Sequence, residues 1–269
     1  MDYLIAIEEV LREARLRVLK SLRRADVFKI VGRGAAGDKT MLIDKLAEDA
    51  VISLLSERFK SFTVVSEETG VRRFGEGELI AVLDPLDGST NALRGFPFYS
   101  ISLALADGMR LENVKAAGVI DIPRGSLYTA SKRYGSRLNG EPIRVSKSEK
   151  LEESVVGIDL NVKGVALGYV SRIAPVVERA YTVRFMGSNA LGLCMVASGV
   201  YDAFVDLRGI LRVLDSAAGI FIVEEAGGII LNQLGRKPNP ELTPRSRISI
   251  VAASTRRLAA EILRLASEE

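Results

Sequence analysis

Two aspartates, Asp84 and Asp87, stand three residues apart around a proline in the segment DPLDGSTN at 84–91, directly after an apolar run. The apolar run predicts a strand, so both carboxylates lie just past a strand's carboxyl end, where the sites of α/β proteins usually form. Gly88 allows a backbone to approach a ligand, Ser89 supplies a hydroxyl, and the N–H groups of such a turn bind anions. A simple turn with a helix cap is the structural alternative, but the eight residues together favour a chemical site.

Two further acidic segments have the same placement beside apolar runs. VSEE puts the adjacent Glu67 and Glu68 after a short predicted strand, and LDSAAG puts Asp215 at the start of a predicted apolar helix. Adjacent glutamates are usually surface residues, and an aspartate at a helix start is usually an N-cap. Together with Asp84 and Asp87, however, they form a carboxylate-only set that suits Mg²⁺, Mn²⁺ or Ca²⁺ better than zinc.

The composition restricts the catalytic chemistry further. The chain of 269 residues has no histidine, which excludes Ser-His-Asp hydrolysis, phosphohistidine chemistry and histidine-bound zinc. Its one cysteine, Cys194, cannot form an intramolecular disulfide and lies in the segment LCMVASG, which is typical of a small buried side chain. Catalysis must therefore rest on carboxylates, hydroxyls, Lys, Arg, Tyr or hard metal ions.

The charge and hydropathy patterns predict a cytoplasmic protein with no nucleic-acid or membrane partner. No apolar run approaches the roughly 18 residues needed to cross a bilayer, and the N-terminus alternates apolar and charged residues, unlike a signal peptide. The net charge is +3, and basic residues cluster mostly on the polar side of the first predicted helix. A solvated helix face explains this cluster, because no aromatic interleaving or recognition motif accompanies it.

The elements that must position these residues form two groups. Apolar residues spaced by three and four predict amphipathic helices over 4–22 and 43–55, and a strand-rich region follows. After about residue 150, strands and helices alternate, including a helix that is interrupted or ended near Pro175. This pattern predicts a layered α/β protein, with an N-terminal α+β metal-binding half over 1–150 and a C-terminal α/β half over 151–269 that completes the substrate pocket.

VSEE, DPLDGSTN and LDSAAG, in this order and at this separation, resemble the inositol monophosphatase and fructose-1,6-bisphosphatase superfamily of lithium-sensitive sugar phosphatases. The resemblance covers nearly the whole chain, including GDKTMLIDKLAED and RFMGSNALGLCMVASGVYDAFVD, and is greatest to the archaeal dual-activity enzymes. It implies an αβαβα sandwich and a phosphoric monoester hydrolase that acts on fructose 1,6-bisphosphate, inositol 1-phosphate or both. It also implies two or three Mg²⁺ ions per site, with Mn²⁺ as a substitute, and a homodimer.

The same resemblance implies a role for each residue of the metal site. Glu67, Asp84 and the carbonyl of Leu86 would hold the first ion. Asp84, Asp87 and Asp215 would hold the second. Metal ions in such a site reverse the repulsion between carboxylates and a phosphate dianion, and they lower the pKa of a bound water molecule.

The resemblance further implies how water and phosphate are placed. Ser89, which stands where the inositol phosphatases usually have threonine, would position the attacking water together with Asp44. The N–H groups of Gly88 and Ser89 would receive the phosphate. A third, weaker ion would lie near Glu67, under the mobile loop that carries Asp38. We expect direct in-line attack by water, without a covalent phospho-enzyme.

Substrate contacts are expected from the second half of the chain. Arg184 and Arg208 are candidates for a second phosphate or for sugar hydroxyls, because guanidinium groups fit phosphate bidentately. A structural salt bridge explains each arginine equally well. Ser188, Asn189 and Asp206 lie where the resembled family contacts the sugar.

Two features of the motifs favour the fructose bisphosphatase branch, and two alternatives remain. VSEE and the serine of DGSTN are closer to that branch, and Leu214 stands before Asp215 where tryptophan is common in the inositol branch. The first alternative is a phosphatase of the same superfamily that acts on adenosine 3′,5′-bisphosphate or NADP. The second is a regulatory binding protein that kept the fold and lost activity.

Overall fold

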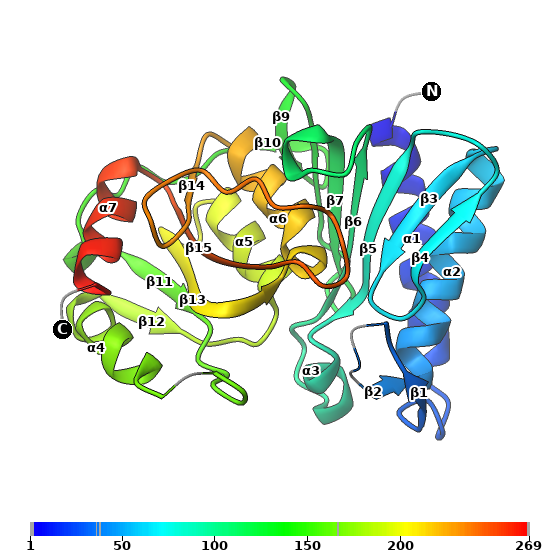
Figure 1. Cartoon of the computed structure of the whole chain (residues 1–269), viewed down its shortest axis with the longest axis horizontal. Helices are drawn as coiled ribbons and strands as arrows, with labels where there is room; N and C mark the ends of the chain where they lie inside the picture. The colour runs from blue at the N-terminus through cyan, green and yellow to red at the C-terminus, as the bar shows by residue number, and fades with distance from the viewer. Residues whose placement is uncertain (1–2, 36, 38, 166, 268–269) are drawn as a thin grey trace.

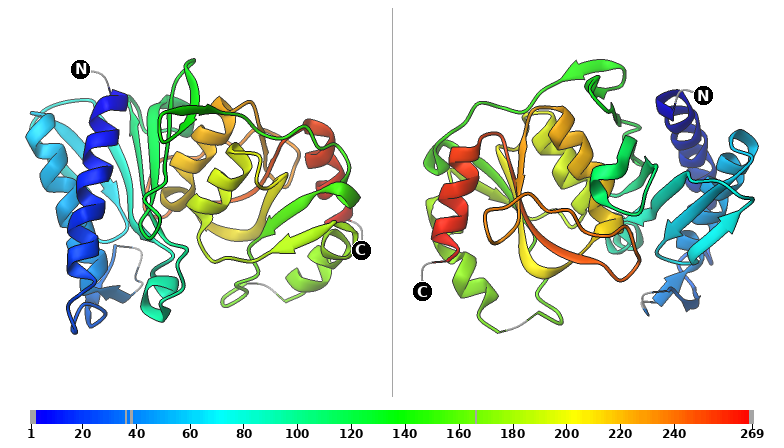
Figure 2. Two further views of the ribbon diagram at one scale, coloured as in Figure 1. Left: turned by 180° about the vertical axis from the view of Figure 1, so that it is seen from behind. Right: turned by 45° about the horizontal axis from the view of Figure 1, so that its top comes forward.

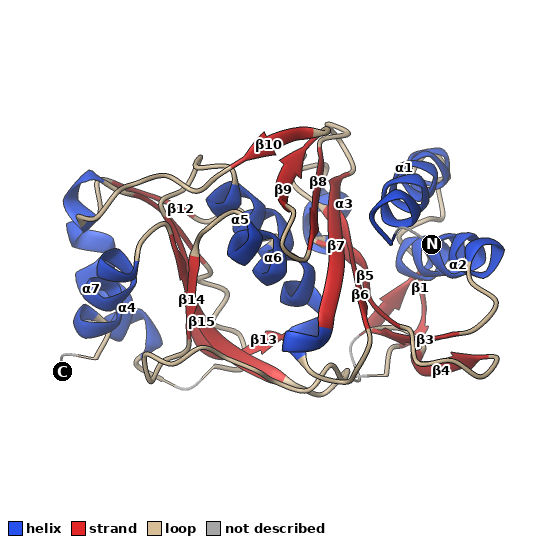
Figure 3. Ribbon diagram, turned by 90° about the horizontal axis from the view of Figure 1, so that it is seen from above, coloured by secondary structure: helices blue, strands red, loops and turns tan. Residues whose placement is uncertain are grey.

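The computed structural model describes residues 3–35, 37, 39–165 and 167–267 and arranges them in five layers (Figure 1). Two large β-sheets, of eight and five strands, run through the molecule, and helices lie outside each sheet and between the two (Figure 3). The first and last helices lie at opposite ends of this stack (Figure 2). The predicted αβαβα architecture is therefore confirmed.

The first sheet is built mainly from strands that are consecutive in the chain. Its order is β10-β9-β8-β7-β6-β5-β3-β4, and the pair of β3 with β5 is parallel whereas its other neighbours are antiparallel. β5 is buried along its whole length, as its nearly continuous apolar sequence requires. The strands are β3 (Phe62–Ser66), β4 (Gly70–Phe74), β5 (Ile80–Asp87), β6 (Ser100–Ala106), β7 (Val114–Asp121), β8 (Leu127–Ser131), β9 (Gly135–Leu138) and β10 (Glu141–Ile143).

Helices α1 (Tyr3–Ser21) and α2 (Leu42–Arg58) cover the outer face of this sheet (Figure 3). Buried residues of α1, such as Ile7, Leu11 and Val18, follow the spacing of three and four that predicted an amphipathic helix. They pack with residues of α2, β3, β5, β6 and β7 in one apolar cluster. A short hairpin precedes α2 and consists of β1 (Ile30–Arg33) and β2 (Lys39–Met41).

Helices α5 (Asn189–Ala197) and α6 (Val213–Glu225) form the central layer between the two sheets (Figure 3). Both are apolar around nearly their whole circumference, which is typical of a helix with neighbours on every side. Gly219 of α6 permits the close approach of α5, because a Cβ atom there would lie 2.7 Å from the Cβ of Leu193. This layer carries residues of the candidate site at its helix starts.

The second sheet has the order β12-β11-β13-β15-β14, and α4 (Tyr169–Arg179) and α7 (Arg256–Leu265) cover its outer face. The predicted interruption near Pro175 is wrong, because α4 continues to Arg179. A proline removes one N–H donor from a helix, while the buried Ile173 and other apolar residues hold α4 against the sheet. The remaining elements are η1 (Leu111–Asn113), η2 (Leu151–Glu153), β11 (Val155–Ile158), β12 (Thr182–Arg184), β13 (Ala203–Arg212), β14 (Ile229–Leu231), β15 (Arg247–Ala253) and α3 (Ser89–Arg94).

The chain passes from the first sheet to the second between Ile143 and Val155. One apolar cluster nevertheless joins residues of both sheets through α5 and α6, from Val82 of β5 to Ile250 of β15. The division at residue 150 into two functional halves stays a prediction. What the packing shows is that the two sheets share their central core.

Candidate active site

A β-bulge in β5 brings Asp84 and Asp87 to the same face of the first sheet. Asp84 pairs with Ser102 of β6 and Asp87 pairs with Ser100, so β5 has one more residue than β6 across this interval. In a regular strand two residues three apart point to opposite faces, and the extra residue cancels that alternation. Pro85 lies within the bulge, where its missing N–H does not break a regular ladder.

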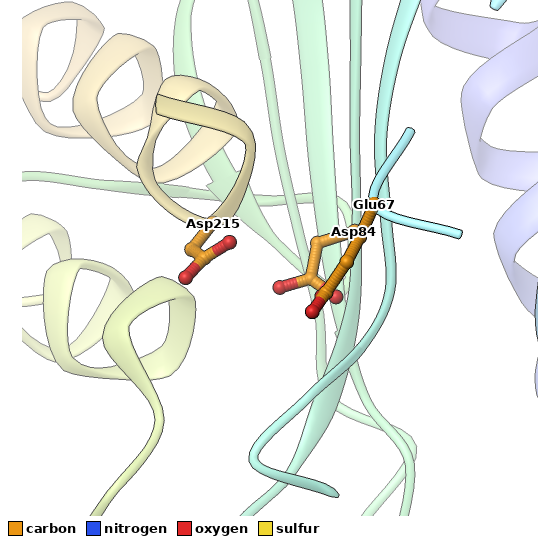
Figure 4. Close-up of side chains that lie close together, drawn as sticks. All are labelled: Glu67, Asp84 and Asp215. Atoms are coloured by element: carbon orange, nitrogen blue, oxygen red, sulfur yellow. The ribbon is translucent and has the colours of Figure 1, made fainter. Parts of the chain in front are cut away.

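Three carboxylates converge at this bulge from three elements (Figure 4). Glu67 follows the last residue of β3, Asp84 lies on the parallel neighbour β5, and Asp215 lies in the first turn of α6. One carboxylate oxygen from each lies within 4.8 Å of the others. Figure 4 shows Asp215 pointing from the α6 side toward the other two. The predicted ligands Glu67, Asp84 and Asp215 are thus brought together.

The oxygen-only donor set fits a hard divalent cation. The Oδ2 atom of Asp84 is buried and has no hydrogen-bond partner among the described residues, whereas its Oδ1 accepts from the N–H of Leu86 at 3.0 Å. A buried carboxylate oxygen without a donor is unfavourable unless a cation or a donor approaches it. Carboxylates of this kind prefer Mg²⁺, Mn²⁺ or Ca²⁺. The residues therefore fit the metal that the sequence predicts.

Burial and repulsion from neighbouring acids raise the pKa of Glu67, Asp84 and Asp87. Burial raises the pKa of Glu67 to about 8, and Asp215 adds to the shift while Arg212 opposes it. Burial, followed by repulsion from Asp215, raises the pKa of Asp87 to about 7. The same two causes hold the pKa of Asp84 well above its usual range. A cation placed here must therefore displace protons at neutral pH.

Arg212 inserts a positive charge into this cluster, and the sequence analysis missed it. Its Nε donates to both oxygens of Asp215, at 2.9 and 3.0 Å, and its Nη1 donates to Glu67. Arg212 immediately precedes α6, three residues before Asp215. That spacing was the one available signal, because a residue at a helix N-cap lies beside the third residue of the first turn.

Asp87 is held by the start of α5. Its Oδ2 accepts from the hydroxyl of Ser188 and from the N–H of Ala190 at 2.8 Å, and its Oδ1 accepts from the N–H of Asn189 at 3.3 Å. The hydroxyl of Ser188 also caps α5 by accepting from the N–H of Leu191. Ser188, predicted to contact the sugar, is buried against Asp87, whereas Asn189 lines the cleft.

Gly88 and Ser89 form the start of α3 beside the carboxylates. Gly88 has a φ of 91°, and a Cβ there would lie 3.0 Å from the carbonyl oxygen of Phe98, so glycine is required on both grounds. Asn91 ties this turn to the second half of the chain, because its Nδ2 donates to the carbonyls of Phe98 and Met186 at 2.7 Å each. Both predicted phosphate-binding residues line the cleft.

Asp44 enters the same cleft from α2. Its Oδ2 accepts from the N–H of Met41 at 2.8 Å, as an acidic side chain in a first helical turn commonly does. Burial raises the pKa of Asp44 to about 7. Glu68 lies nearby and accepts from the hydroxyl of Thr40. Asp38, assigned to the mobile loop, lies outside the described residues.

Arg208 and Asp206 form a buried ion-pair network rather than a free binding surface. Arg208 donates to both oxygens of Asp206, at 2.9 and 2.6 Å, and its Nη2 lies 2.8 Å from Asp159. The side chain of Arg208 is only 5% exposed, although part of it lines the cleft. Arg184 is exposed, and its Nη1 donates to the hydroxyl of Thr182 and to the carbonyl of Val183.

Most of these groups line one cleft of about 1030 Å³. The predicted site residues that line it are Asp44, Glu67, Leu86, Asp87, Gly88, Ser89, Asn189, Arg208 and Asp215. Arg184 and Ser188 border a smaller hollow beside it. A cleft with clustered carboxylates next to a glycine-started helix can hold cations and a phosphate together.

Comparison with known proteins agrees with this fold. The sequence matches the inositol monophosphatase family over residues 2–269. It is 40% identical over 248 residues to the fructose-1,6-bisphosphatase/inositol-1-monophosphatase of Methanothermobacter thermautotrophicus, with 88% of this chain and 87% of that protein covered. It is 32% identical to the bifunctional NADP phosphatase/NAD kinase of Methanococcus maripaludis, with 84% of this chain and 42% of that protein covered.

A solved structure shows the same arrangement of elements. The MJ0109 gene product, described as an inositol monophosphatase–fructose 1,6-bisphosphatase, superposes with a TM-score of 0.85 at 28% identity, covering 98% of this chain and 100% of that chain. The fold and site thus define a phosphatase. The chain belongs to the inositol monophosphatase family, and the predicted enzyme class, a phosphoric monoester hydrolase, is confirmed.

No helix in the described part of the chain has the length and apolar character that a membrane span needs. The predicted cytoplasmic location stays a prediction.

Proposed function

We propose that this chain is a Mg²⁺-dependent phosphatase that hydrolyses fructose 1,6-bisphosphate, inositol 1-phosphate or both. The observation that carries the proposal is the convergence of Glu67, Asp84 and Asp215 within 4.8 Å in a cleft that Gly88 also lines. The name of the Methanothermobacter relative, which includes both activities, supports the same substrates.

In the proposed mechanism, one set of residues holds the metal ions and another places the water and the phosphate. When bound, metal ions supply positive charge that stabilises phosphoryl transfer and acidifies water. Glu67, Asp84, Asp87, Asp215 and the carbonyl of Leu86 would hold those ions.

Ser89 and Asp44 would orient the attacking water molecule, while the N–H groups of Gly88 and Ser89 bind the phosphate. Water would attack the phosphorus in line and the P–O bond to the sugar would break. The attacking water would give up one proton, and the departing sugar oxygen would take one up. Inorganic phosphate and a free hydroxyl result, with no covalent enzyme intermediate. A phosphorylated aspartate trapped during turnover would contradict this sequence of events.

The charge around the cleft supports a substrate with more than one negative group. Lys39, Lys163 and Arg247 line it, and Arg247 donates from Nη1 to the carbonyls of Pro244 and Ser246. Arg208 would act mainly by ordering the cleft wall, because its guanidinium is engaged by two aspartates. Arg184 remains a proposed contact for the sugar or its second phosphate.

A nucleotide phosphatase is the second candidate function. The 32% identity to a protein named bifunctional NADP phosphatase/NAD kinase favours it, and a cleft of about 1030 Å³ has room for a nucleotide. Adenosine 3′,5′-bisphosphate is the related alternative. The chemistry would be the same, so only the substrate order separates these candidates.

The test is phosphate release with Mg²⁺ from fructose 1,6-bisphosphate, inositol 1-phosphate, adenosine 3′,5′-bisphosphate and NADP. We expect turnover that EDTA abolishes, and a loss of more than about 100-fold in Asp87→Asn. Asp49→Asn is the matched control, because Asp49 is an exposed carboxylate of α2. Turnover that survives EDTA would exclude the metal mechanism, and metal binding without turnover on any substrate would favour a regulatory protein.

We also propose the homodimer implied by the sequence resemblance. Light scattering that gives the mass of one 29.2 kDa chain would exclude it.

A further inference from the structure

Several buried side-chain oxygen atoms have no hydrogen-bond partner among the described residues, and three of them lie at the bulge between β5 and β6: Asp84 Oδ2, Ser100 Oγ and Ser102 Oγ. Asp84 and Ser102 are each 1% exposed and Ser100 is 0% exposed. A buried polar atom without a partner costs free energy, so each one in a folded protein calls for an explanation. For Ser102, a hydrogen bond to the facing carboxylate would supply it.

Ser102 lies directly opposite Asp84 on the neighbouring strand. The two residues are register partners in the antiparallel pair of β5 and β6, so their side chains project from the same face of the sheet. Val82 and Ala104, on the same face, pack in the central cluster with α5 and α6. Directly opposed Cβ atoms lie about 4.5–5.5 Å apart, which a serine hydroxyl and a carboxylate oxygen can bridge by rotation about χ1.

A hydrogen bond from the Ser102 hydroxyl to Asp84 would still leave room for a cation on the other side of this carboxylate. β5 lies between β3 and β6, so Glu67 is on one side of Asp84 and Ser102 on the other. A carboxylate oxygen has two acceptor directions. The hydroxyl can take one from the β6 side while a cation shared with Glu67 and Asp215 takes the other.

We propose that Ser102 is a positioning residue that donates its hydroxyl to Asp84 Oδ2 and fixes this carboxylate for the metal ion. The inference rests on the proposed metal-dependent function. Partners that hydrogen-bond a ligating carboxylate set its orientation, and their loss typically lowers metal affinity about 10- to 100-fold. The hydroxyl touches neither substrate nor ion and acts through Asp84.

Ser100 provides a matched control within the same strand. It is equally buried, equally without a partner, and lies opposite Asp87 in the register. Asp87, however, already accepts hydrogen bonds from the hydroxyl of Ser188 and from the N–H groups of Asn189 and Ala190. Removing the Ser100 hydroxyl should therefore leave the orientation of Asp87 nearly unchanged.

The experiment measures the dissociation constants of Mg²⁺ and Mn²⁺ by titration calorimetry for the full chain and for Ser102→Ala, Ser102→Thr and Ser100→Ala. Ser102→Ala should bind metal about 10- to 100-fold more weakly. Ser102→Thr, which keeps the hydroxyl, should recover most of the affinity, and Ser100→Ala should match the unsubstituted chain. At saturating Mg²⁺ the KM for substrate should not change in Ser102→Ala.

The outcomes separate this inference from the proposed function. If the unsubstituted chain binds neither ion, the proposed function fails and this inference fails with it. If that chain binds the ions and Ser102→Ala binds them as tightly as Ser100→Ala, only the role of Ser102 is overturned. Thermal unfolding in EDTA checks the fold of each variant. If Ser102→Ala does not fold, Ser102→Cys replaces it, because a thiol is only a weak hydrogen-bond donor. A metal affinity in Ser102→Cys equal to that of the unsubstituted chain would then overturn the inference.

Discussion

Arg212 and Asp215 form an ion pair in which one guanidinium nitrogen, Nε, contacts both carboxylate oxygens at 2.9 and 3.0 Å. The same guanidinium also donates to Glu67, which follows β3 of the first sheet. Two acids that could ligate a metal are therefore already neutralised in part by a side chain. The Arg212 guanidinium thus occupies carboxylate oxygens that a bound metal ion would also contact.

Replacing this arginine should destabilise the metal-free protein. In Arg212→Gln, Glu67 and Asp215 lose their counter-charge while they stay largely buried. Breaking such a pair by removing one partner typically lowers the free energy of unfolding by about 3 kcal/mol. Urea unfolding in EDTA measures the loss, which should shrink at saturating Mg²⁺ because the ion replaces the lost charge.

The control is Arg24→Gln. Arg24 forms an ion pair with Asp26 in which both side chains are more than half exposed, at 51% and 56%. Pairs of this kind contribute little to stability. Equal losses in the two variants, or a loss in Arg212→Gln that Mg²⁺ leaves untouched, would contradict the assigned role.

The buried carboxyls should make the metal-free protein less stable as the pH rises. Burial raises the pKa of Asp44 and Asp87 to about 7 and that of Glu67 to about 8. Unfolded carboxyls titrate near pH ~4. Between these limits the folded state holds more protons, so this contribution is complete below about pH 4 and is lost by about pH 8. Urea unfolding in EDTA from pH 5 to pH 9 measures the slope.

Saturating Mg²⁺ should reverse this trend, since the ions bind the deprotonated carboxylates and their affinity rises with pH. Asp44→Asn is the internal comparison, because it removes one of the titrating groups and should flatten the metal-free slope near pH 7. A metal-free protein that gains stability from pH 5 to pH 8 through these groups would show that the carboxyls are ionised in the absence of metal.

Gly88→Ala should impair both stability and phosphate binding, whereas Gly95→Ala should affect stability alone. Both glycines have a positive φ, 91° and 72°, so alanine at either one costs about 1–2 kcal/mol of backbone strain. At Gly95 a Cβ would meet nothing within 4 Å, but at Gly88 it would lie 3.0 Å from the Phe98 carbonyl oxygen. Only Gly88→Ala should therefore displace the turn beside Asp87.

Steady-state kinetics measures the difference. We expect kcat/KM to fall more than about tenfold in Gly88→Ala and less than about twofold in Gly95→Ala, at a temperature where both variants are folded. Similar kinetics in the two variants would mean that the turn does not place the phosphate.

Lys163→Gln and Arg247→Gln should distinguish substrates with one and two phosphates. Both side chains line the cleft and are exposed, and the Arg247 guanidinium keeps further donors although its Nη1 donates to the carbonyls of Pro244 and Ser246. Losing one charged hydrogen bond should raise the KM for fructose 1,6-bisphosphate about tenfold and leave inositol 1-phosphate nearly unaffected. Lys60→Gln, an exposed residue outside the cleft, is the control. A parallel rise for both substrates would place these cations at the scissile phosphate instead.

The sequence predicted the carboxylate cluster because its members stand beside recognisable strands and at a helix start. The expectation that Asp84 and Asp87 lie just past a strand is wrong, because both lie within β5. The sequence did not show how the two share a face, since strict strand alternation separates them and only the bulge opposite Ser100 and Ser102 brings them together. Register across two strands is a property of their pairing rather than of either segment.

The sequence was also ambiguous for the arginines. Arg208 could equally have faced the substrate or formed a structural ion pair. Its contact with Asp206 is local to β13, but its contact with Asp159 depends on the packing of β11 beside β13. Arg212 escaped notice for the same reason, because Glu67, one of its partners, lies 145 positions away. Local patterns locate acids near strand ends, but they do not identify which cation each acid meets.

The central layer of α5 and α6 links metal affinity to the integrity of the whole molecule. Asp215 is delivered by α6, and Glu67 and Asp84 by the first sheet, so an ion held by all three joins two parts of the chain that also share one core. Binding at such a junction adds RT ln(1 + [L]/Kd) to the free energy of unfolding of both parts at once. If the cellular Mg²⁺ concentration fell, proteases would then degrade the protein faster and the protein would hydrolyse its substrate more slowly.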